Sequence, residues 1–444
     1  MHEVDNLKEE TNSKIIEGRR IVHLQTLGEQ LICNKCKSIL SLTDTVEEKN
    51  VGLASIFYVR CRECKITSSV CSDKYHKTAD QNIHFDTNTK AVIGALNTGN
   101  GNTHLNGILS AFNIPQFNWK SFKTPEKKPS HLDRSFIFPN LPTLSESVSI
   151  NSEHKVRVAA SLDMGWFTRS TGRSYNSFSG TASLIGLFSK KVISYVTLNR
   201  KCKKCDKGYD VKDHDCRRNF SGTAKAMEPH AAVQLTKNNR TLMDCEIDVG
   251  IIIADNDSSS IATLRNAHDF EVVKQADKNH TSKGVVNALY KLQKNHKELT
   301  STTIQYLQKC FNYSISQNAG SSEDNPDTYR HTNIGDGLAD QKLFDTLIIL
   351  FDDLAANAYT YSAGASSNPN ESLNNIIVSK APKSRMYGMS ISSDIRVACA
   401  INKKNDGEIF LTSLAKKLNV SPGKHTQKYS TDADNKSRKR YEKS

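Results

Sequence analysis

Two aspartates directly follow an apolar run in the sequence. The stretch VGIIIADNDSSS (249–260) puts Asp255 and Asp257 at the end of a predicted buried strand. Carboxylates in this position suggest a bound cation, and Mg²⁺ prefers oxygen ligands while keeping several waters. Two such ions, about 3.5–4 Å apart, can promote phosphodiester cleavage. Strand-end geometry favours Asp255 as the ligand, whereas Asp257 either caps the following helix or substitutes for Asp255.

Further carboxylates in the sequence are candidates for the same site. The predicted strand KVRVAASLDM ends near Asp163, and SSNPNESLNNIIV contains Glu371. Because Asn368, Pro369 and Asn370 interrupt the chain, we expect a helix to start with Glu371. An acidic residue in a first helical turn also fits a simple cap. Glu228, in AMEP, is interpreted as a surface helix residue that could also face the site.

Eight cysteine and histidine residues form two groups with metal-ligand spacing. In the first group, CNKC and CREC are separated by 24 residues, and each CxxC pair points two sulfurs toward one point. In the second, CKKCDKGYDVKDHDC has three sulfurs and an imidazole among few apolar residues, so it needs a metal to fold. Zinc prefers such tetrahedral sites. The predicted ligands are Cys33, Cys36, Cys61 and Cys64 in the first group, and Cys202, Cys205, His214 and Cys216 in the second.

Length and charge limit the class of protein. The 444 residues exceed one ordinary domain, and the formal net charge of +13 with a pI of about 9.1 predicts a polyanionic partner, of which nucleic acid is the commonest. The start of the chain has no apolar segment of signal-peptide length. The longest apolar run, LFDTLIILF (343–351), is far shorter than the ~20 residues that a bilayer needs. These features predict a soluble intracellular protein with no membrane partner.

Composition divides the chain into four predicted parts. A zinc-binding module comes first, followed by a polar connector, a main domain and a basic tail without core-forming residues, which we expect to be disordered. The tail's cluster of Lys436, Arg438, Lys439 and Arg440 fits a nuclear address, a phosphate contact or a merely solvated tail. The predicted boundaries are 1–75, 76–150, 151–420 and 421–444.

Predicted strands and helices alternate along the main domain. Three strands at hairpin spacing precede the second cysteine group, and then helix, strand, helix, strand and helix follow. This order is typical of an α/β, ribonuclease H-like fold, in which three antiparallel strands and further parallel strands form a mixed sheet flanked by helices. The first and fourth strands lie side by side in that fold, which brings Asp163 close to Asp255. The predicted strands are 155–164, 181–189, 191–199, 249–255 and 270–276.

Several motifs, taken in order, resemble the Mutator-like transposases of the branch common in arthropod genomes. They are SLDMGW, CKKC…HDCRRNFSGTAKAMEP, IIADNDSSS, ADKNH and NESLNN…APKSRMYG. The resemblance implies a DDE catalytic core in which Asp163, Asp255 and Glu371 bind Mg²⁺ or Mn²⁺. It implies two-metal hydrolysis and transesterification of double-stranded DNA at transposon ends and target, in a nuclear homodimer or larger assembly. It also implies that Asp277-x2-His280, in ADKNH, matches a family signature that positions DNA or a ligand water.

Other functions remain open on the sequence alone. The first is a catalytically silent, domesticated zinc-containing DNA-binding protein derived from such a transposase. The second is a ribonuclease H-like nuclease of cellular function, although the sequence has no aromatic-rich basic motif for single-stranded RNA. The third is a zinc-scaffolded interaction module, which leaves the strand-end aspartates without a purpose. Possible phosphate contacts near the carboxylates are Arg169, Arg173, Lys380, Lys383 and Arg385.

Overall fold

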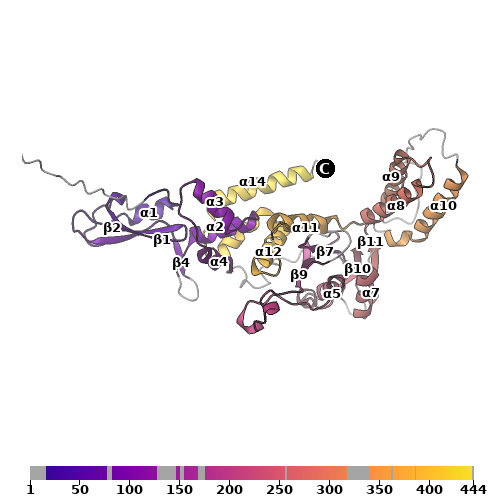
Figure 1. The fold of residues 1–444 in the computed structure, drawn as a ribbon, viewed down its shortest axis with the longest axis horizontal. Helices are drawn as coiled ribbons and strands as arrows, with labels where there is room; N and C mark the ends of the chain where they lie inside the picture. Colours follow the sequence, from indigo (N-terminus) through magenta and orange to yellow (C-terminus); the bar gives the residue numbers. More distant parts are fainter. Residues whose placement is uncertain are drawn as a thin grey trace, which may run out of the picture. The chain divides into compact units, whose positions relative to one another are not determined.

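The protein divides into two compact units in a computed structural model of the chain (Figure 1). One unit combines residues 1–134 with 394–444, and the other consists of residues 135–393. The structure describes residues 17–77, 83–127, 147–150, 155–168, 176–255, 258–317, 340–361, 364–385 and 387–442.

The first unit begins with an antiparallel sheet of strand order β1-β2-β3. The central strand reads ASIFYVR, and its alternate side chains are buried because successive residues of a strand point to opposite faces. Phe57, Val59 and Val70 form a small core there with Cys33 and Cys61. A short β4-β5 hairpin follows. The elements are α1 (Leu24–Gln30), β1 (Thr45–Val51), β2 (Ala54–Arg60), β3 (Thr67–Cys71), β4 (Tyr75–Lys77) and β5 (Ile83–Phe85).

Helices from both ends of the chain complete the first unit. Helix α14 is polar, but its Asp434 side chain accepts hydrogen bonds from the backbone N–H groups of Glu408 (2.7 Å) and Ile409 (3.1 Å). This contact anchors α14 to the turn before α13. The helices are α2 (Asp86–Asn97), α3 (Asn102–Ala111), α4 (Trp119–Lys127), α12 (Ile391–Asp406), α13 (Phe410–Lys417) and α14 (Lys424–Tyr441). Helix α12 belongs to this unit from Asp394 onward.

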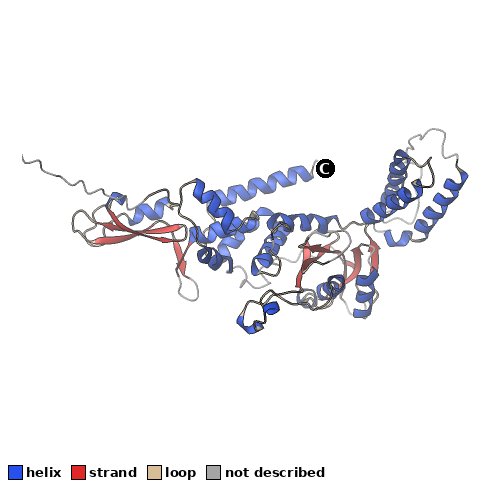
Figure 2. Cartoon of the chain, in the orientation of Figure 1, coloured by secondary structure: helices blue, strands red, loops and turns tan. Residues whose placement is uncertain are grey.

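A mixed sheet with strand order β11-β10-β7-β8-β9 is the centre of the second unit, and β6 also pairs with β7 (Figure 2). Strands β7, β8 and β9 are antiparallel neighbours, whereas β10 runs parallel to both β7 and β11. The mixed α/β architecture predicted from the sequence is thus confirmed. The strands are β6 (Ser147–Ile150), β7 (Val156–Trp166), β8 (Ser179–Gly186), β9 (Val192–Asn199), β10 (Ile247–Ala254) and β11 (Val273–Ala276).

The two faces of β7 have different neighbours. Its even-numbered residues, such as Leu162 and Met164, enter a core with Met227 of α5 and Leu264 of α7. Its odd-numbered residues 161–165 meet the opposite helix, α11 (Asn368–Lys380). This division follows from the two-residue period of a strand. Figure 1 labels α5 (Ala224–Thr236) and α7 (Ser258–Ala267) beside β10. The short helix α6 (Arg240–Asp244) precedes β10 in the sequence.

A second hydrophobic core joins three helices between β11 and α11. Leu289 of α8, Ile304 of α9 and Leu343 of α10 are among its buried residues, together with Tyr361. The helices are α8 (Lys278–Gln293), α9 (Ser301–Gln317) and α10 (Gln341–Ala356). In the described parts of the chain, no helix combines the length and apolar character that crossing a bilayer requires.

The structure differs from the sequence-based expectations in three places. The tail expected to be disordered instead contains α14, because the Asp434 contact with backbone N–H groups is invisible to hydropathy. Helix α11 begins at Asn368 rather than at Glu371. Pro369 lies in its first turn, where a helix tolerates proline because N–H groups there have no intrahelical partner. In addition, residues 394–420 group with the first unit and not with residues 151–393 as the predicted domain boundaries had them.

Candidate functional site

The strand register places three aspartates at the same level. Ile253 of β10 pairs with Ser161 of β7, so two residues further along each strand Asp255 follows beside Asp163. Ala254 of β10 pairs with Ala276 of β11, so the next residue after each strand, Asp255 and Asp277 respectively, lies at the same level. Because β10 is parallel to both neighbours, the carboxyl ends of the strands meet at one edge. The sequence-based expectation that Asp163 and Asp255 lie close together is consistent with this register.

Helix α11 brings Glu371 to the same edge of the sheet. Asn370 is fully buried, and its Nδ2 donates to the backbone oxygen and the hydroxyl of Ser183, each at 3.0 Å. The hydroxyl of Ser161 donates to Oδ1 of Asn370. These bonds fix the first turn of α11 on β7 and β8, directly beside Asp163. Glu371 is the next residue in that turn.

His280 lies between two of the carboxylates. Its Nδ1 is 3.3 Å from Oδ1 of Asp255, and its Nε2 is 3.8 Å from Oε1 of Glu371. The side chains of Asp255 and Glu371 are 44% and 49% exposed, so both can contact a bound ion or substrate. The His280 ring therefore lies between the carboxylate of Asp255, just after β10, and that of Glu371 in α11.

Mutual repulsion and burial act on the aspartates. Burial raises the pKa of Asp163, and the charge of Asp255 raises it further. Burial also raises the pKa of Asp255; His280 opposes that rise, while Asp277 and Glu371 add to it. The positive charges nearby, His280 for both aspartates and Lys274 for Asp255, do not offset these effects, because both pKa values stay raised. A bound cation would supply further positive charge.

Asp277 has a structural task that the sequence did not indicate. It is buried, with 1% of its surface exposed. Its Oδ1 accepts from the backbone N–H of His280 (2.8 Å) and caps α8, and its Oδ2 accepts from the backbone N–H of Ser367. Burial raises the pKa of Asp277, but these hydrogen bonds outweigh burial and lower it overall. Asp277 thus ties the start of α8, which carries His280, to the start of α11, which carries Glu371.

Other residues singled out in the sequence have different positions. Glu228 lines a small pocket with Asp255, between the sheet and helices α5 and α7. Lys380 is buried, with 1% exposed, so the prediction that it contacts phosphate from the surface is wrong. Three residues lie outside the described parts of the chain, namely Asp257, Arg169 and Arg173.

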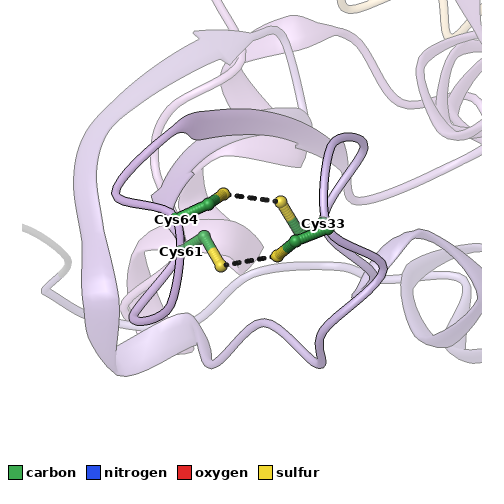
Figure 3. Close-up of side chains that lie close together, drawn as sticks. Cys33, Cys61 and Cys64 are labelled. Atoms are coloured by element: carbon green, nitrogen blue, oxygen red, sulfur yellow. Dashed lines mark hydrogen bonds between the residues drawn. The ribbon is translucent and has the colours of Figure 1, made fainter.

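The first cysteine group lies in the sheet-containing part of the first unit (Figure 3). The sulfurs of Cys33 and Cys64 are 3.5 Å apart, as are those of Cys36 and Cys61. Both CxxC turns have the same backbone bond, from the N–H four residues after the first cysteine back to its carbonyl. The hydroxyl of Ser38 lowers the pKa of the Cys36 thiol to about 6, which favours the thiolate that binds metal. These four cysteines could hold a zinc ion.

The second group lies between β9 and α5. Nε2 of His214 is 3.2 Å from Sγ of Cys202 and 3.5 Å from Sγ of Cys205, and Cys216 is 3.5 Å from Cys205. Nδ1 of His214 is 2.8 Å from the carbonyl of Asp210. A carbonyl only accepts, so Nδ1 carries the proton and Nε2 offers its lone pair to the sulfurs' centre. This group could also hold zinc.

The carboxylates are spaced more widely than the ligands of either cysteine group. In the described parts of the chain, only the two cysteine groups have three or more potential ligand atoms within 4.8 Å of one another. The carboxylates of β7, β10 and α11 therefore do not form one closed cage. A wider, open arrangement suits ions that keep several waters and also contact a substrate.

The sequence did not reveal the roles of Asn370, which had been interpreted as interrupting the chain, or of Asn374; both lie in the NESLNN motif around Glu371. Asn370 docks α11 on the sheet, and Nδ2 of Asn374 donates to Oδ2 of Asp163 at 2.7 Å. The available signal was their spacing of four residues, which puts both side chains on one face of a helix. A polar pair on a helix is common on surfaces, so the spacing alone did not separate these residues from solvated ones.

Residues 18–334 match the profile of the Mutator-like transposases. The match covers well over half of the chain, including β7, β10 and the start of α8, and it ends before Glu371. The chain therefore belongs to the Mutator-like transposase family, which implies a transposase-type function and suggests DNA as a partner. Comparison with the curated proteins finds no match.

Proposed function

We propose that the protein is a DNA transposase whose catalytic carboxylates are Asp163, Asp255 and Glu371. The observation that carries this proposal is the approach of Glu371 of α11 and Asp255 of β10 to opposite nitrogens of His280, with Asp163 level with Asp255. Family membership supports the same reading. Three antiparallel strands followed by parallel strands with helices on both faces support a ribonuclease H-like, DDE-type core.

The donor set fits Mg²⁺ or Mn²⁺ better than it fits zinc. The three carboxylates offer only oxygen atoms, at least two of them on half-exposed side chains, and hard divalent cations prefer oxygen while retaining waters. The raised pKa values of Asp163 and Asp255 point to the same need for positive charge. When bound, two such ions supply Lewis acidity and align the attacking and leaving oxygens of an in-line displacement.

The chain's own residues hold and order this site. Asp163 and Asp255 provide carboxylates from neighbouring strands, and Glu371 provides one from α11. His280 is fixed by the Asp277 cap and lies beside two carboxylates, where it orders their side chains and can donate to a phosphate oxygen of DNA. The reaction requires no covalent link between protein and DNA. Water attacks the phosphodiester at the transposon end and releases a 3′-hydroxyl, and this hydroxyl then attacks a phosphodiester of target DNA and displaces a 3′-oxygen of the target strand.

DNA is the proposed partner, and the nucleus is the proposed location. The net charge of +13 favours a polyanion, and affinity based on phosphate contacts should fall steeply with salt. The exposed basic residues near the end of α14 are candidates both for phosphate contact and for a nuclear address. A homodimer or larger assembly, bound to two transposon ends, completes the proposal. A DNA-binding protein that has lost cleavage activity is the alternative.

Cleavage assays with matched substitutions test the proposal. We would measure nicking of supercoiled plasmid, and cleavage and joining of labelled duplexes that carry candidate element ends, with Mg²⁺ or Mn²⁺. Asp163→Asn, Asp255→Asn and Glu371→Gln should each lower the rate at least about 100-fold without loss of DNA binding. The controls are Asp353→Asn and Glu271→Gln, because both residues are exposed and lie away from the site in the fold.

Two results would count against this function. If the wild-type protein binds DNA but neither nicks nor joins it with either ion, the silent DNA-binding alternative is the better account. If the wild type cuts and the control substitutions reduce cutting as much as the three carboxylate substitutions, the activity comes from another part of the protein or from a contaminant.

A further inference from the structure

Asn374 makes a direct contact with one of the proposed catalytic carboxylates. Its Nδ2 donates to Oδ2 of Asp163 at 2.7 Å. The direction of the bond is fixed by chemistry, because an ionised carboxylate only accepts hydrogen bonds and the amide nitrogen only donates. Asn374 lies one helical turn after the fully buried Asn370, which is bonded to Ser161 and Ser183.

The two asparagines of α11 match the spacing of residues along one face of β7. Four residues of a helix rise about 6 Å, and two residues of a strand rise about 6.6 Å. Asn370 therefore meets Ser161 and Asn374 meets Asp163 without a change in direction of either element. The first contact holds the helix in register for the second.

Gly165 leaves the space that Asn374 occupies. A Cβ atom at Gly165 would lie 2.3 Å from Oδ1 and 2.9 Å from Cγ of Asn374. Contacts between carbon and oxygen at such distances do not occur, so any other residue would displace the Asn374 amide. Glycine inside a strand weakens it and often marks a close approach of another group. Here the approaching group is the amide that holds Asp163.

We propose that Asn374 is a positioning residue that orients the Asp163 carboxylate for metal binding, with Gly165 as the residue that admits it. This inference rests on the proposed function and names a further residue of the same site. An amide suits the task because it donates a hydrogen bond without adding charge. A lysine would place a cation where the metal binds, and an aspartate would repel Asp163.

The test compares the metal requirement of variants rather than their activity alone. We would measure the Mn²⁺ concentration that gives half-maximal plasmid nicking, and the rise in Tm that Mn²⁺ causes in the zinc-loaded full chain. Asn374→Ala should raise the Mn²⁺ requirement about 10–100-fold, as expected for a residue that orients a metal ligand, and should lose less activity at saturating Mn²⁺. Asn374→Ser is the second variant, should the alanine variant fail to fold.

A double-substitution cycle tests the role of Gly165. Gly165→Ala should raise the Mn²⁺ requirement as Asn374→Ala does, because it displaces the same amide. The pair Gly165→Ala/Asn374→Ala should be little worse than either single variant, since residues that act through one contact are not additive. Asn375→Ala is the matched control, because Asn375 is the exposed neighbour on the same helix, and it should leave the Mn²⁺ requirement unchanged.

The outcomes separate this inference from the proposed function. If wild type does not cut but Mn²⁺ raises its Tm and this rise depends on Asn374, the cleavage proposal fails while the positioning role stands. If wild type cuts and Asn374→Ala or Asn374→Ser keeps the wild-type Mn²⁺ requirement, the positioning role is wrong while the function stands. If Mn²⁺ affects neither cutting nor Tm of the wild type, both are wrong.

Discussion

Asp255 lies beside Asp163 because β10 runs parallel to β7 with Ile253 paired to Ser161. Two carboxylates are thus held at one edge of the sheet by backbone pairing, which side-chain motion cannot undo. Burial raises both pKa values, the charge of Asp255 raises that of Asp163 further, and the charges of Asp277 and Glu371 raise that of Asp255 further. Ionised Asp163 and Asp255 therefore destabilise the fold at the point where the proposed function requires negative charge. Such destabilising groups are common at functional sites.

Neutralising Asp163 should stabilise the protein in the absence of divalent ions. A raised folded-state pKa means that the folded state favours the protonated form, so its cost appears as pH rises above the ordinary value of 3.8 and grows until the folded-state carboxyl is ionised. Asp163→Asn removes this cost and keeps an oxygen for Asn374. We expect a Tm increase of roughly 2–4 °C, equivalent to about 1 kcal/mol, at pH 7.5 in EDTA-free, Mg²⁺-free buffer.

The Tm difference between Asp163→Asn and the wild type should depend on pH and on Mn²⁺. The advantage of Asp163→Asn should shrink as pH falls toward the ordinary value of 3.8, because the cost of ionising the folded wild-type carboxyl is then lost. Mn²⁺ should raise the Tm of the wild type more than that of the variant. An equal or lower Tm for Asp163→Asn at pH 7.5 would show that the site carries no net repulsion.

Removing the Asp277 side chain should loosen the junction between α8 and α11. Asp277→Ala loses the cap of α8 and leaves the buried N–H of Ser367 without its acceptor. A lost cap costs about 1 kcal/mol, and an unsatisfied buried donor costs about 1–3 kcal/mol. We expect chemical denaturation to give a free energy of unfolding lower by about 2 kcal/mol or more, with cleavage reduced as well.

Asp277→Asn separates shape from charge at this position. It keeps an oxygen that can cap α8, so its loss should be smaller than that of Asp277→Ala. Because the folded-state pKa of Asp277 is lowered, the charge stabilises the fold above its ordinary value of 3.8 and this contribution disappears as pH falls further. The difference between wild type and Asp277→Asn should therefore be constant from pH 7 down to about 4.5 and diminish as pH falls below the ordinary value of 3.8. A pH-independent difference would exclude a role for the charge.

The two cysteine groups should bind zinc independently. Metal analysis of the purified chain should give two zinc ions, one for each group. Cys36→Ser and Cys205→Ser should each lose one ion, and Cys205→Ser should open residues 202–216 to proteolysis because that segment has few apolar residues. Cys245→Ser is the control, because Cys245 is an exposed thiol outside both groups. Retention of both ions in the Cys205→Ser variant would exclude the second site.

The basic end of α14 should contribute to DNA affinity through charge. Replacing Arg438, Lys439 and Arg440 with Gln removes three exposed cations. If all three contact phosphates, the slope of log K against log salt should become shallower by about 2.7. The control replaces three exposed lysines of the other unit with Gln, namely Lys291, Lys294 and Lys297. Equal changes in the two variants would mean that only net charge matters.

The sequence predicted the acidic residues of the site better than it predicted their supports. The apolar run before Asp255 and the strand before Asp163 have strong patterns, and the order of elements predicted that these strands are neighbours. No such pattern marks Asn374 or Gly165, because their roles at the site depend on contacts between residues more than 200 positions apart. The structural contacts of Asp277 were not predicted for the same reason, since its partner Ser367 is 90 residues away. Asp257 and its role stay a prediction.

The most direct test of the central claim is to map where a hard divalent ion binds on the protein. Fe²⁺ can replace Mg²⁺ at oxygen sites, and with ascorbate and peroxide it cuts the backbone close to where it is bound; mass spectrometry then locates the cuts. In zinc-loaded protein, we predict cuts near residues 163, 255 and 371 that excess Mg²⁺ suppresses and that Asp255→Asn abolishes. Cuts that avoid all three segments, or that persist unchanged in Asp255→Asn, would contradict a metal site formed by these carboxylates.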